Sequence, residues 1–464
     1  YYNNQNNHGR NRKLMETAIQ FVTGRRLEED ENIDDGNNYD DGNNYDDGYN
    51  YNNDNNDDNG IDYQSNIGIG DITLLIGIST VCCGVICSLA LLLLLHFSKI
   101  LIQTALIFNI LVSILATIAA FMAGSPFGGI TFAIITIFMI YYAKVMWSRI
   151  PFAATNLKTS VTSVQKNGGL SFIAYGSLLI LFGWSVWWSV AFVASLYVTG
   201  GCSADGVCEN DINGWIAFGF FVSYFWTHQV IKYTLHVTVA GAVGTWWFTP
   251  LEAASCCSRA VRDSFLRAIT LSFGSICFGS LIVAIVQATK EALRNLRDNG
   301  DSVLLCMAEC ILGCIETLIE CFNNWAFVFV GLYGYNFLDA GRNVVTLFKS
   351  RGWDTIITDH LVSSVLYLVS IGVGLLTGII ASLVAHSQGM IFGNDSGSLA
   401  IPFLIGLVIG FVLTSVMMSV VASAVNTIIV CYAEAPNEFQ TNHPQLSNEM
   451  RAAWREAWPV DFKY

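Results

Sequence analysis

The chain has 464 residues, of which 53% are hydrophobic and only 13% are charged. An ordinary soluble domain carries roughly a quarter of charged residues, so this composition excludes a soluble globular protein of the same length. The net charge of −13 is concentrated in residues 1–70, which hold 15 of the 36 acidic and 5 of the 23 basic side chains. The remainder is nearly neutral, and we expect no nucleic acid partner.

Residues 1–70 form an acidic segment rich in Asn, Asp and Tyr. From Asp34 the sequence runs DDGNNY-DDGNNY-DDGYNY, and few aliphatic residues accompany this repeat. Apolar burial is therefore too small to offset the entropy lost on ordering the backbone. We predict that residues 1–70 are disordered.

Long apolar stretches follow between residues 71 and 432. At 1.5 Å per helical residue, each is long enough to cross a hydrocarbon core about 30 Å thick. They predict an all-α fold, a polytopic transmembrane bundle of about nine helices. The predicted spans are 72–97, 100–123, 127–147, 171–198, 213–248, 266–289, 303–338, 358–386 and 399–432.

Two predicted spans, 213–248 and 303–338, are too long for a single upright crossing. Each is steeply tilted, broken, or extended beyond the bilayer. The adjacent amides of Asn323 and Asn324 favour a break in the second, because two amides within lipid would need hydrogen-bond partners.

Lysine and arginine in the connections set the orientation, since short cytoplasmic loops carry an excess of both. The connections 148–170, 249–265 and 339–357 are basic, so we expect them in the cytoplasm together with a C-terminal tail, 433–464. Segment 1–70 is then extracellular. A basic group at Lys290, Arg294 and Arg297 contradicts this alternation, but the other loops outweigh it.

The two remaining connections contain few basic residues and are expected outside. In 199–212, Cys202 and Cys208 flank a short polar loop, and they form a disulfide or stay as thiols depending on the redox compartment. In 387–398, Asn394 begins an Asn-Asp-Ser glycosylation sequon, which agrees with an outside position.

Ionisable residues recur within the apolar stretches, where they are costly unless they face a cavity or a partner. Glu309, Glu316 and Glu320 share one helical stripe. The stripe could attract a cation or relay protons, although we favour pairing with the nearby basic group or an interfacial helix. Lys232 lies in a ladder with His228 and His236, and we expect it to be salt-bridged.

Several short segments between residues 149 and 450 resemble the signature segments of the choline transporter-like family, also described as plasma-membrane choline transporters. Their order along the chain makes chance similarity improbable. The segments are RIPFAA at 149–154, HVTVAG at 236–241, TWWF at 245–248, GSICFGSL at 274–281, NNWA at 323–326, YG at 333–334, CYAE at 431–434 and NHP at 442–444.

The resemblance implies a plasma-membrane protein that transports choline or a related amine cation. The family has ten helices, both termini in the cytoplasm, and a large extracellular loop after the first helix. The span at 72–97 resembles the second of these helices, so we expect the first to be absent and residues 1–70 to take the place of the loop.

A quaternary ammonium group is recognised by aromatic ring faces, each worth roughly 0.5–2 kcal/mol. The chain offers such rings in its apolar stretches, although Trp and Tyr also gather at membrane interfaces as anchors. The candidate substrate-binding residues are Trp184, Trp188, Trp226, Trp246, Tyr233, Tyr333 and Asn324.

We therefore expect facilitated or potential-driven transport of a small choline-like cation through a bundle spanning residues 71–432. The alternative is a structural or lipid-organising membrane protein whose extracellular segment 1–70 mediates assembly with a protein partner. No nucleotide-binding glycine loop, catalytic triad or histidine pair at metal spacing occurs in the sequence, so we expect neither an enzyme nor a cofactor or metal.

Overall fold

The computed structural model describes residues 69–124, 126–199, 214–253, 258–298, 303–351, 354–388 and 399–457. Almost all of the acidic segment 1–70 lies outside these ranges. The predictions for Cys202, Cys208 and Asn394 also fall outside the described residues.

All the regular elements of the described residues are helices, which confirms the predicted all-α class. Within the part of the chain that the structure describes, six stretches are long and apolar enough to cross a membrane, and the count of about nine crossings stays a prediction. The end of α5 from Trp187 onward belongs to a separate unit. The elements are α2 (Ile69–Met122), α3 (Pro126–Met146), the 3-10 helix η1 (Trp147–Arg149), α4 (Ile150–Lys166), α5 (Gly169–Thr199), α6 (Gly214–Phe248), the 3-10 helix η2 (Pro250–Ala253), α7 (Arg259–Ile269), α8 (Phe273–Asp298), α9 (Val303–Tyr333), α10 (Phe337–Arg351), α11 (Asp354–Ser387), α12 (Ala400–Glu434), α13 (Pro436–Asn442) and α14 (Pro444–Ala457).

Helix α2 has 54 residues, so an unbroken helix would extend about 80 Å, far more than one crossing needs. Phe97 interrupts it with φ −122° and ψ 24°, outside the helical region. This kink divides α2 at the predicted boundary between the spans 72–97 and 100–123.

The predicted break at Asn323-Asn324 is wrong. Helix α9 runs through both residues and ends at Tyr333, and Gly334 follows with φ +72°, a conformation that favours glycine. The Asn323 amide finds its partner on a neighbouring helix: it donates a hydrogen bond to the Gly279 carbonyl of α8 at 3.0 Å. A satisfied amide gives the helix no reason to break.

The predicted span 266–289 joins parts of two helices. Residues 270–272 separate α7 from α8, and Ser258 caps α7 by accepting a hydrogen bond from the Val261 amide. Helix α8 then continues to Asp298, so Lys290 and Arg294 lie within a helix instead of a loop. This explains why they depart from the charge rule for loops.

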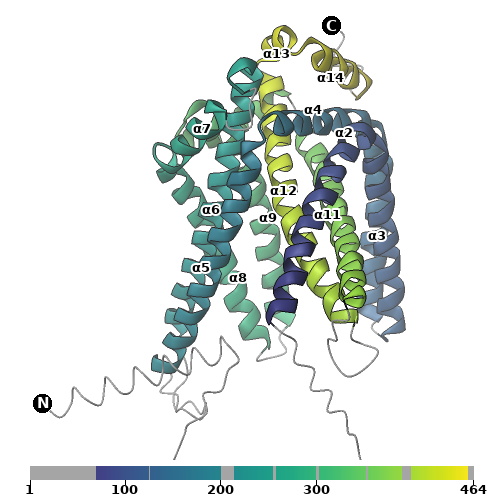
Figure 1. The fold of residues 1–464 in the computed structure, drawn as a ribbon, viewed down its shortest axis with the longest axis vertical. Helices are drawn as coiled ribbons and strands as arrows, with labels where there is room; N and C mark the ends of the chain where they lie inside the picture. Colours follow the sequence, from purple (N-terminus) through teal and green to yellow (C-terminus); the bar gives the residue numbers. More distant parts are fainter. Residues whose placement is uncertain are drawn as a thin grey trace, which may run out of the picture. The chain divides into compact units, whose positions relative to one another are not determined.

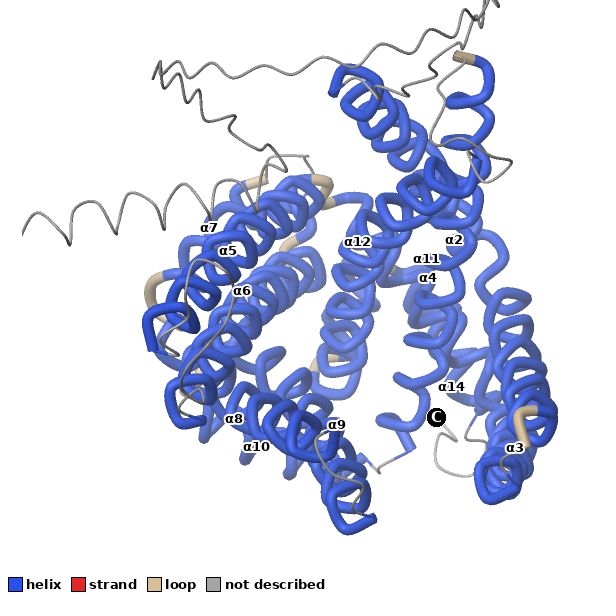
Figure 2. The backbone as a smooth tube through the Cα atoms, turned by 90° about the horizontal axis from the view of Figure 1, so that it is seen from below, coloured by secondary structure: helices blue, strands red, loops and turns tan. Residues whose placement is uncertain are grey.

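Helix α12 lies at the centre of the bundle, with α6 on one side and α11 and α2 on the other (Figure 2). Its closest neighbour is α11, and glycines let the two backbones approach. A β-carbon on Gly406 would lie 2.5 Å from the Ala381 β-carbon and 2.8 Å from the Thr377 carbonyl oxygen, and one on Gly378 would lie 2.8 Å from the Phe403 carbonyl oxygen. These small residues are the packing surface of the helix pair.

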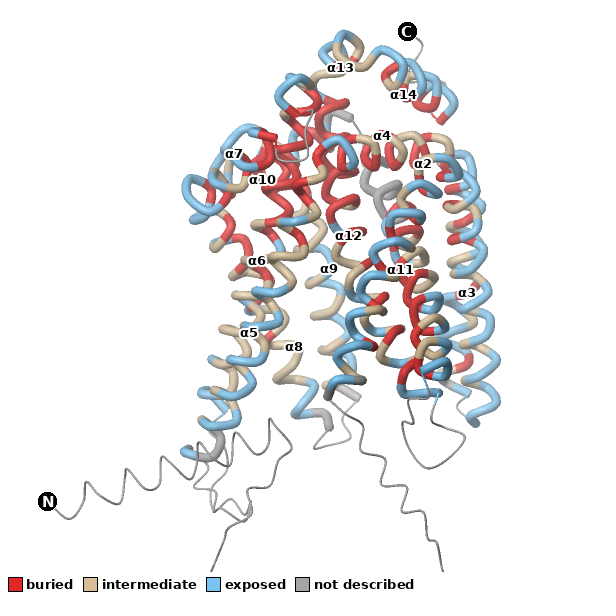
Figure 3. The backbone as a smooth tube through the Cα atoms, in the orientation of Figure 1, coloured by how far each residue is buried: buried red, intermediate tan, exposed pale blue. Residues whose placement is uncertain are grey.

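Helix α4 runs across one end of its neighbours (Figure 1). Residues 148–170 were expected to form a loop, but most of α4 is buried, including the polar side chains of Asn156, Thr159 and Ser163. The buried residues of α6 and α12 concentrate in the halves nearest this end (Figure 3). The core of the bundle is therefore thickest where α4 covers it.

The C-terminal helices α13 and α14 pack on the same end, through aromatic contacts. The Phe439 ring is fully buried and stacks on Trp247 at 3.9 Å between centroids, while the Trp247 indole donates to the Ala435 carbonyl at 3.1 Å. Trp454 of α14 meets Phe152 of α4 edge-on at 4.8 Å. The segment expected as a tail thus contributes part of the core.

Polar contacts reinforce this docking. The Asn442 amide donates to the Trp247 carbonyl oxygen at 3.0 Å, and Lys158 pairs with Glu449 at 2.6 Å. His443 stacks on Trp246 at 4.1 Å, and its Nε2 lies 3.1 Å from the Trp246 carbonyl oxygen. A carbonyl only accepts, so Nε2 carries the proton.

Replacing Gly406 by alanine should destabilise the α11–α12 pair by about 1–3 kcal/mol, because the new methyl group meets a backbone oxygen that cannot move aside. The measurement is the thermal unfolding midpoint in detergent. Gly372→Ala on α11 is the matched control, since no atom lies within 4 Å of its β-carbon position. Equal midpoints for the two variants would contradict the close packing.

Burial lowers the pKa of His443, and the hydrogen bond to the Trp246 carbonyl only partly opposes this effect. Because the folded pKa lies below the unfolded value of about 6.5, the unfolded chain binds more protons. The stability contributed by neutral His443 is therefore complete above that pH and is lost as the pH falls through the folded pKa. The thermal unfolding midpoint should fall as the pH is lowered below about 6.5, and His443→Gln should weaken this pH dependence. If the variant shows the same dependence of midpoint on pH as the wild-type protein, His443 is not its source.

Candidate functional site

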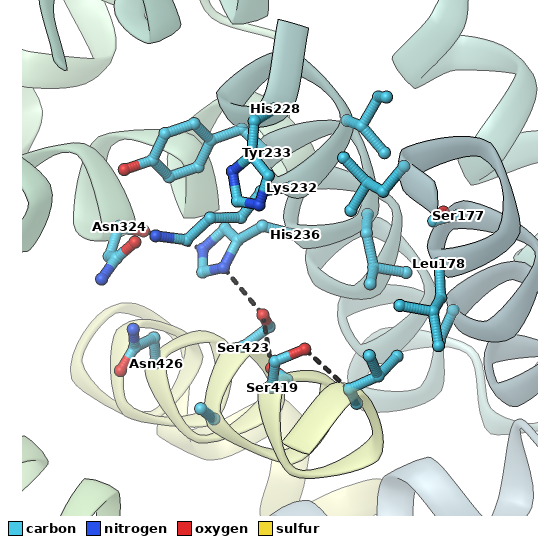
Figure 4. Close-up of a pocket in the computed structure, with 16 residues that line it drawn as sticks. Ser177, Leu178, His228, Lys232, Tyr233, His236, Asn324, Ser419, Ser423 and Asn426 are labelled. Carbon is cyan, nitrogen blue, oxygen red and sulfur yellow. Dashed lines mark hydrogen bonds between the residues drawn. The ribbon is translucent and has the colours of Figure 1, made fainter. Parts of the chain in front are cut away.

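A cavity of about 210 Å³ lies among α5, α6, α9 and α12. This volume corresponds to roughly seven water molecules, enough for a small organic molecule. Polar side chains point into it from α6 and α12 (Figure 4). Its walls consist of Ala174, Ser177, Leu178 and Leu181 on α5; His228, Ile231, Lys232, Tyr233, Leu235 and His236 on α6; Asn324 on α9; and Val416, Ser419, Ala422, Ser423 and Asn426 on α12.

Helical periodicity accounts for this lining. On α6 the residues His228, Lys232 and His236 are four apart, and on α12 the residues Ser419, Ser423 and Asn426 are four and three apart. Side chains at these spacings share one helix face. Two polar stripes in otherwise apolar helices therefore face each other across the cavity.

His236 connects three of the helices. Its Nε2 lies 2.9 Å from the carbonyl oxygen of Asn324, and its Nδ1 lies 2.8 Å from the Ser423 hydroxyl. The carbonyl can only accept, which assigns the proton of the neutral ring to Nε2, and Nδ1 then accepts from Ser423. This bridge from α6 to α9 and α12 makes His236 a structural member of the cavity wall.

Lys232 brings a positive charge to the cavity, and α9 supplies its counter-ion. The Lys232 ammonium lies 3.4 Å from Oε1 of Glu320, which confirms the expected salt bridge. The same ammonium lies 5.4 Å from the centroid of the Tyr233 ring, within the range of a cation–π contact. The pair leaves the cavity close to neutral.

A second ion pair lies beside the first. Lys290 on α8 contacts Glu316 on α9 at 2.8 Å, as the expected pairing of the acidic stripe requires. Two glutamines connect the pairs. Gln229 donates to Glu320 at 3.3 Å, Gln287 donates to Glu316 at 2.9 Å, and Gln229 lies 3.1 Å from the side-chain oxygen of Gln287. The network fixes α6, α8 and α9, which pack against one another.

The structure brings Tyr233 and Asn324 together in the cavity, both of which are predicted site residues. Elsewhere, the Trp226 indole donates to the Cys277 carbonyl at 3.0 Å, and Trp246 is held by His443. The Tyr333 hydroxyl donates to the carboxylate of Glu434. The cavity wall of α5 ends at Leu181, before Trp184, and Trp188 stacks on Phe192 of the same helix at 4.9 Å.

Sequence reasoning missed the α12 side of the cavity. Ser419, Ser423 and Asn426 are small polar residues in the long apolar run 399–432, and their shared face was the available signal. Lys232 and His236 were recognised as a ladder but not as cavity residues. The predicted site consisted mainly of tryptophans because aromatic rings were expected to surround the ammonium group.

The helices and the polar cavity define an integral membrane protein of the polytopic, all-helical class. Comparison with known proteins identifies its family. The sequence pattern described as plasma-membrane choline transporter matches residues 130–437, two thirds of the chain. The chain belongs to the choline transporter-like family.

Among its relatives, Protein PNS1 of Gibberella zeae is 30% identical over 336 residues, which cover 69% of this chain and 62% of that protein. A CTL-like protein of Dictyostelium discoideum is 29% identical over 332 residues, covering 70% of this chain and 56% of the relative. Protein PNS1 of Mycosarcoma maydis is 30% identical over 386 residues, covering 80% and 72%. The chain thus spans less than two thirds of the length of the first two.

Proposed function

We propose that this protein carries choline or a related small organic cation across the plasma membrane through the cavity among α5, α6, α9 and α12. The observation that carries the proposal is the cavity itself: polar residues from two facing helix stripes surround a volume of about 210 Å³ in a chain of this family. The Tyr233 ring, fully buried at the cavity wall, suits an ammonium group, and Ser419 and Asn426 offer hydrogen-bond partners for a hydroxyl group.

The membrane potential is a sufficient driving force for this transport. One positive charge that moves inward gains about 2.3 kcal/mol per 100 mV. The charge distribution supports an orientation with the α4 end in the cytoplasm. The connections at this end carry several basic residues, in agreement with the positive-inside rule. They are Arg149, Lys158, Lys166 and Arg262.

Purified protein in liposomes should accumulate radiolabelled choline when the interior is negative. At equilibrium a potential of 100 mV should give a concentration ratio of about fifty, the value that 2.3 kcal/mol supports. Ala422→Phe should abolish this accumulation, because a ring placed at Ala422 fills the cavity.

The matched control is Val408→Phe on the same helix, where the side chain is 55% exposed on the outside of the bundle. We expect this variant to transport at the wild-type rate. Transport by Ala422→Phe at that rate would exclude the cavity as the route, and no accumulation by the wild-type protein would contradict choline transport itself.

A further inference from the structure

The ammonium group of Lys232 has the surroundings that a small organic cation needs. A carboxylate, Glu320, lies 3.4 Å from it, and the ring centroid of Tyr233 lies 5.4 Å away. Figure 4 shows the Lys232 side chain at the cavity wall, with its ammonium between Tyr233 and Asn324. Opposite charge and an aromatic face are the two recognition elements for an alkylammonium ion.

We propose that Lys232 occupies, as a cation tethered to the chain, the subsite that the ammonium group of the cargo takes, and that the two compete for Glu320. The inference rests on the proposed function, because it specifies how the same cavity recognises its cation. It assigns the role of cation acceptor to Glu320 and that of internal competitor to Lys232.

Both partners are accessible enough for such an exchange. The side chain of Lys232 is 42% exposed and that of Glu320 is 30% exposed, so a ligand can reach the pair without separating the helices. The lysine stem is flexible and its ammonium makes a point-charge contact, in contrast to the rigid two-pronged contact of an arginine. Lys232 can therefore leave Glu320 while remaining in the cavity.

The second ion pair has a different character. Of the four residues in the two pairs, Lys232 alone lines the cavity. The side chain of Glu316 is only 17% exposed, against 30% for Glu320. Each glutamate also accepts from a glutamine, Glu320 from Gln229 on α6 and Glu316 from Gln287 on α8. The Lys290–Glu316 pair lies between α8 and α9 and serves their contact. The same ion pair thus occurs twice, once with a lysine that lines the cavity and once with neither partner on its wall.

Competition has a consequence for affinity. With the cavity empty, Lys232 and Glu320 balance each other. When a cation binds Glu320, the displaced Lys232 adds a like charge nearby, which weakens binding and favours release. A transporter needs such a balance, because a site that binds too tightly does not let its cargo leave.

The test is equilibrium binding of radiolabelled choline to the purified, detergent-solubilised protein. Lys232→Met removes the competitor and should tighten binding by about tenfold, while Glu320→Gln removes the acceptor and should weaken it by about tenfold. The control is Lys290→Met, which breaks the other ion pair and should change choline affinity by less than about twofold. The thermal unfolding midpoint of each variant separates a loss of fold from a change in affinity.

The lysine variants decide the question even if Glu320→Gln does not fold. Unchanged or weaker binding by Lys232→Met, with normal binding by the wild-type protein, would overturn the competition and leave the proposed transport function standing. Equal tightening by Lys290→Met would also overturn it, because the effect would then be a general change of charge. Absence of choline binding to the wild-type protein would overturn both proposals.

Discussion

Charge among membrane helices needs an opposite charge nearby, because the hydrocarbon core offers no water to stabilise it. Lys232, Lys290, Glu316 and Glu320 meet this requirement within one network that joins α6, α8 and α9. The arrangement of these helices depends on it: removal of one partner would leave a charge without compensation in a partly buried place. The network also borders the cavity through Lys232, so the element that holds the helices together also sets the charge that a ligand meets.

The segments that resemble the family serve two purposes. Several meet at the α4 end of the bundle, where Asn442 and His443 contact the backbone of Trp247 and Trp246 and Tyr333 donates to Glu434. There the stacked aromatic rings hold the C-terminal helices on the core. Two others reach the cavity through His236 and Asn324. The family segments therefore contribute both to the packing of the end that α4 covers and to the lining of the cavity.

Apolar length was sufficient to predict the helical class and most helix boundaries, including the division of α2 near Phe97, because the cost of exposed backbone in lipid leaves helices as the main solution. Partners distant in sequence could not be predicted in the same way. The amide of Asn323 bonds to Gly279, and that contact keeps α9 unbroken where two amides predicted a break. Gly334, with its positive φ, ends the helix instead.

The site shows the same division between local and distant information. The ladder of His228, Lys232 and His236 follows from spacing along one helix, and a salt bridge for Lys232 was predicted from the cost of its charge. The polar face of α12 becomes part of a site only because that helix packs centrally against α6. The contact of tryptophans with the ligand stays a prediction; in the structure Trp246 stacks on His443, and the Trp226 indole donates to the Cys277 carbonyl.

An experimental structure determined with choline at saturating concentration would show whether the cavity among α5, α6, α9 and α12 holds the cargo. We expect ligand density within the cavity, with the ammonium group between Glu320 and the Tyr233 ring and with the Lys232 side chain moved away. An empty cavity with choline bound at another place in the bundle would contradict the proposed site.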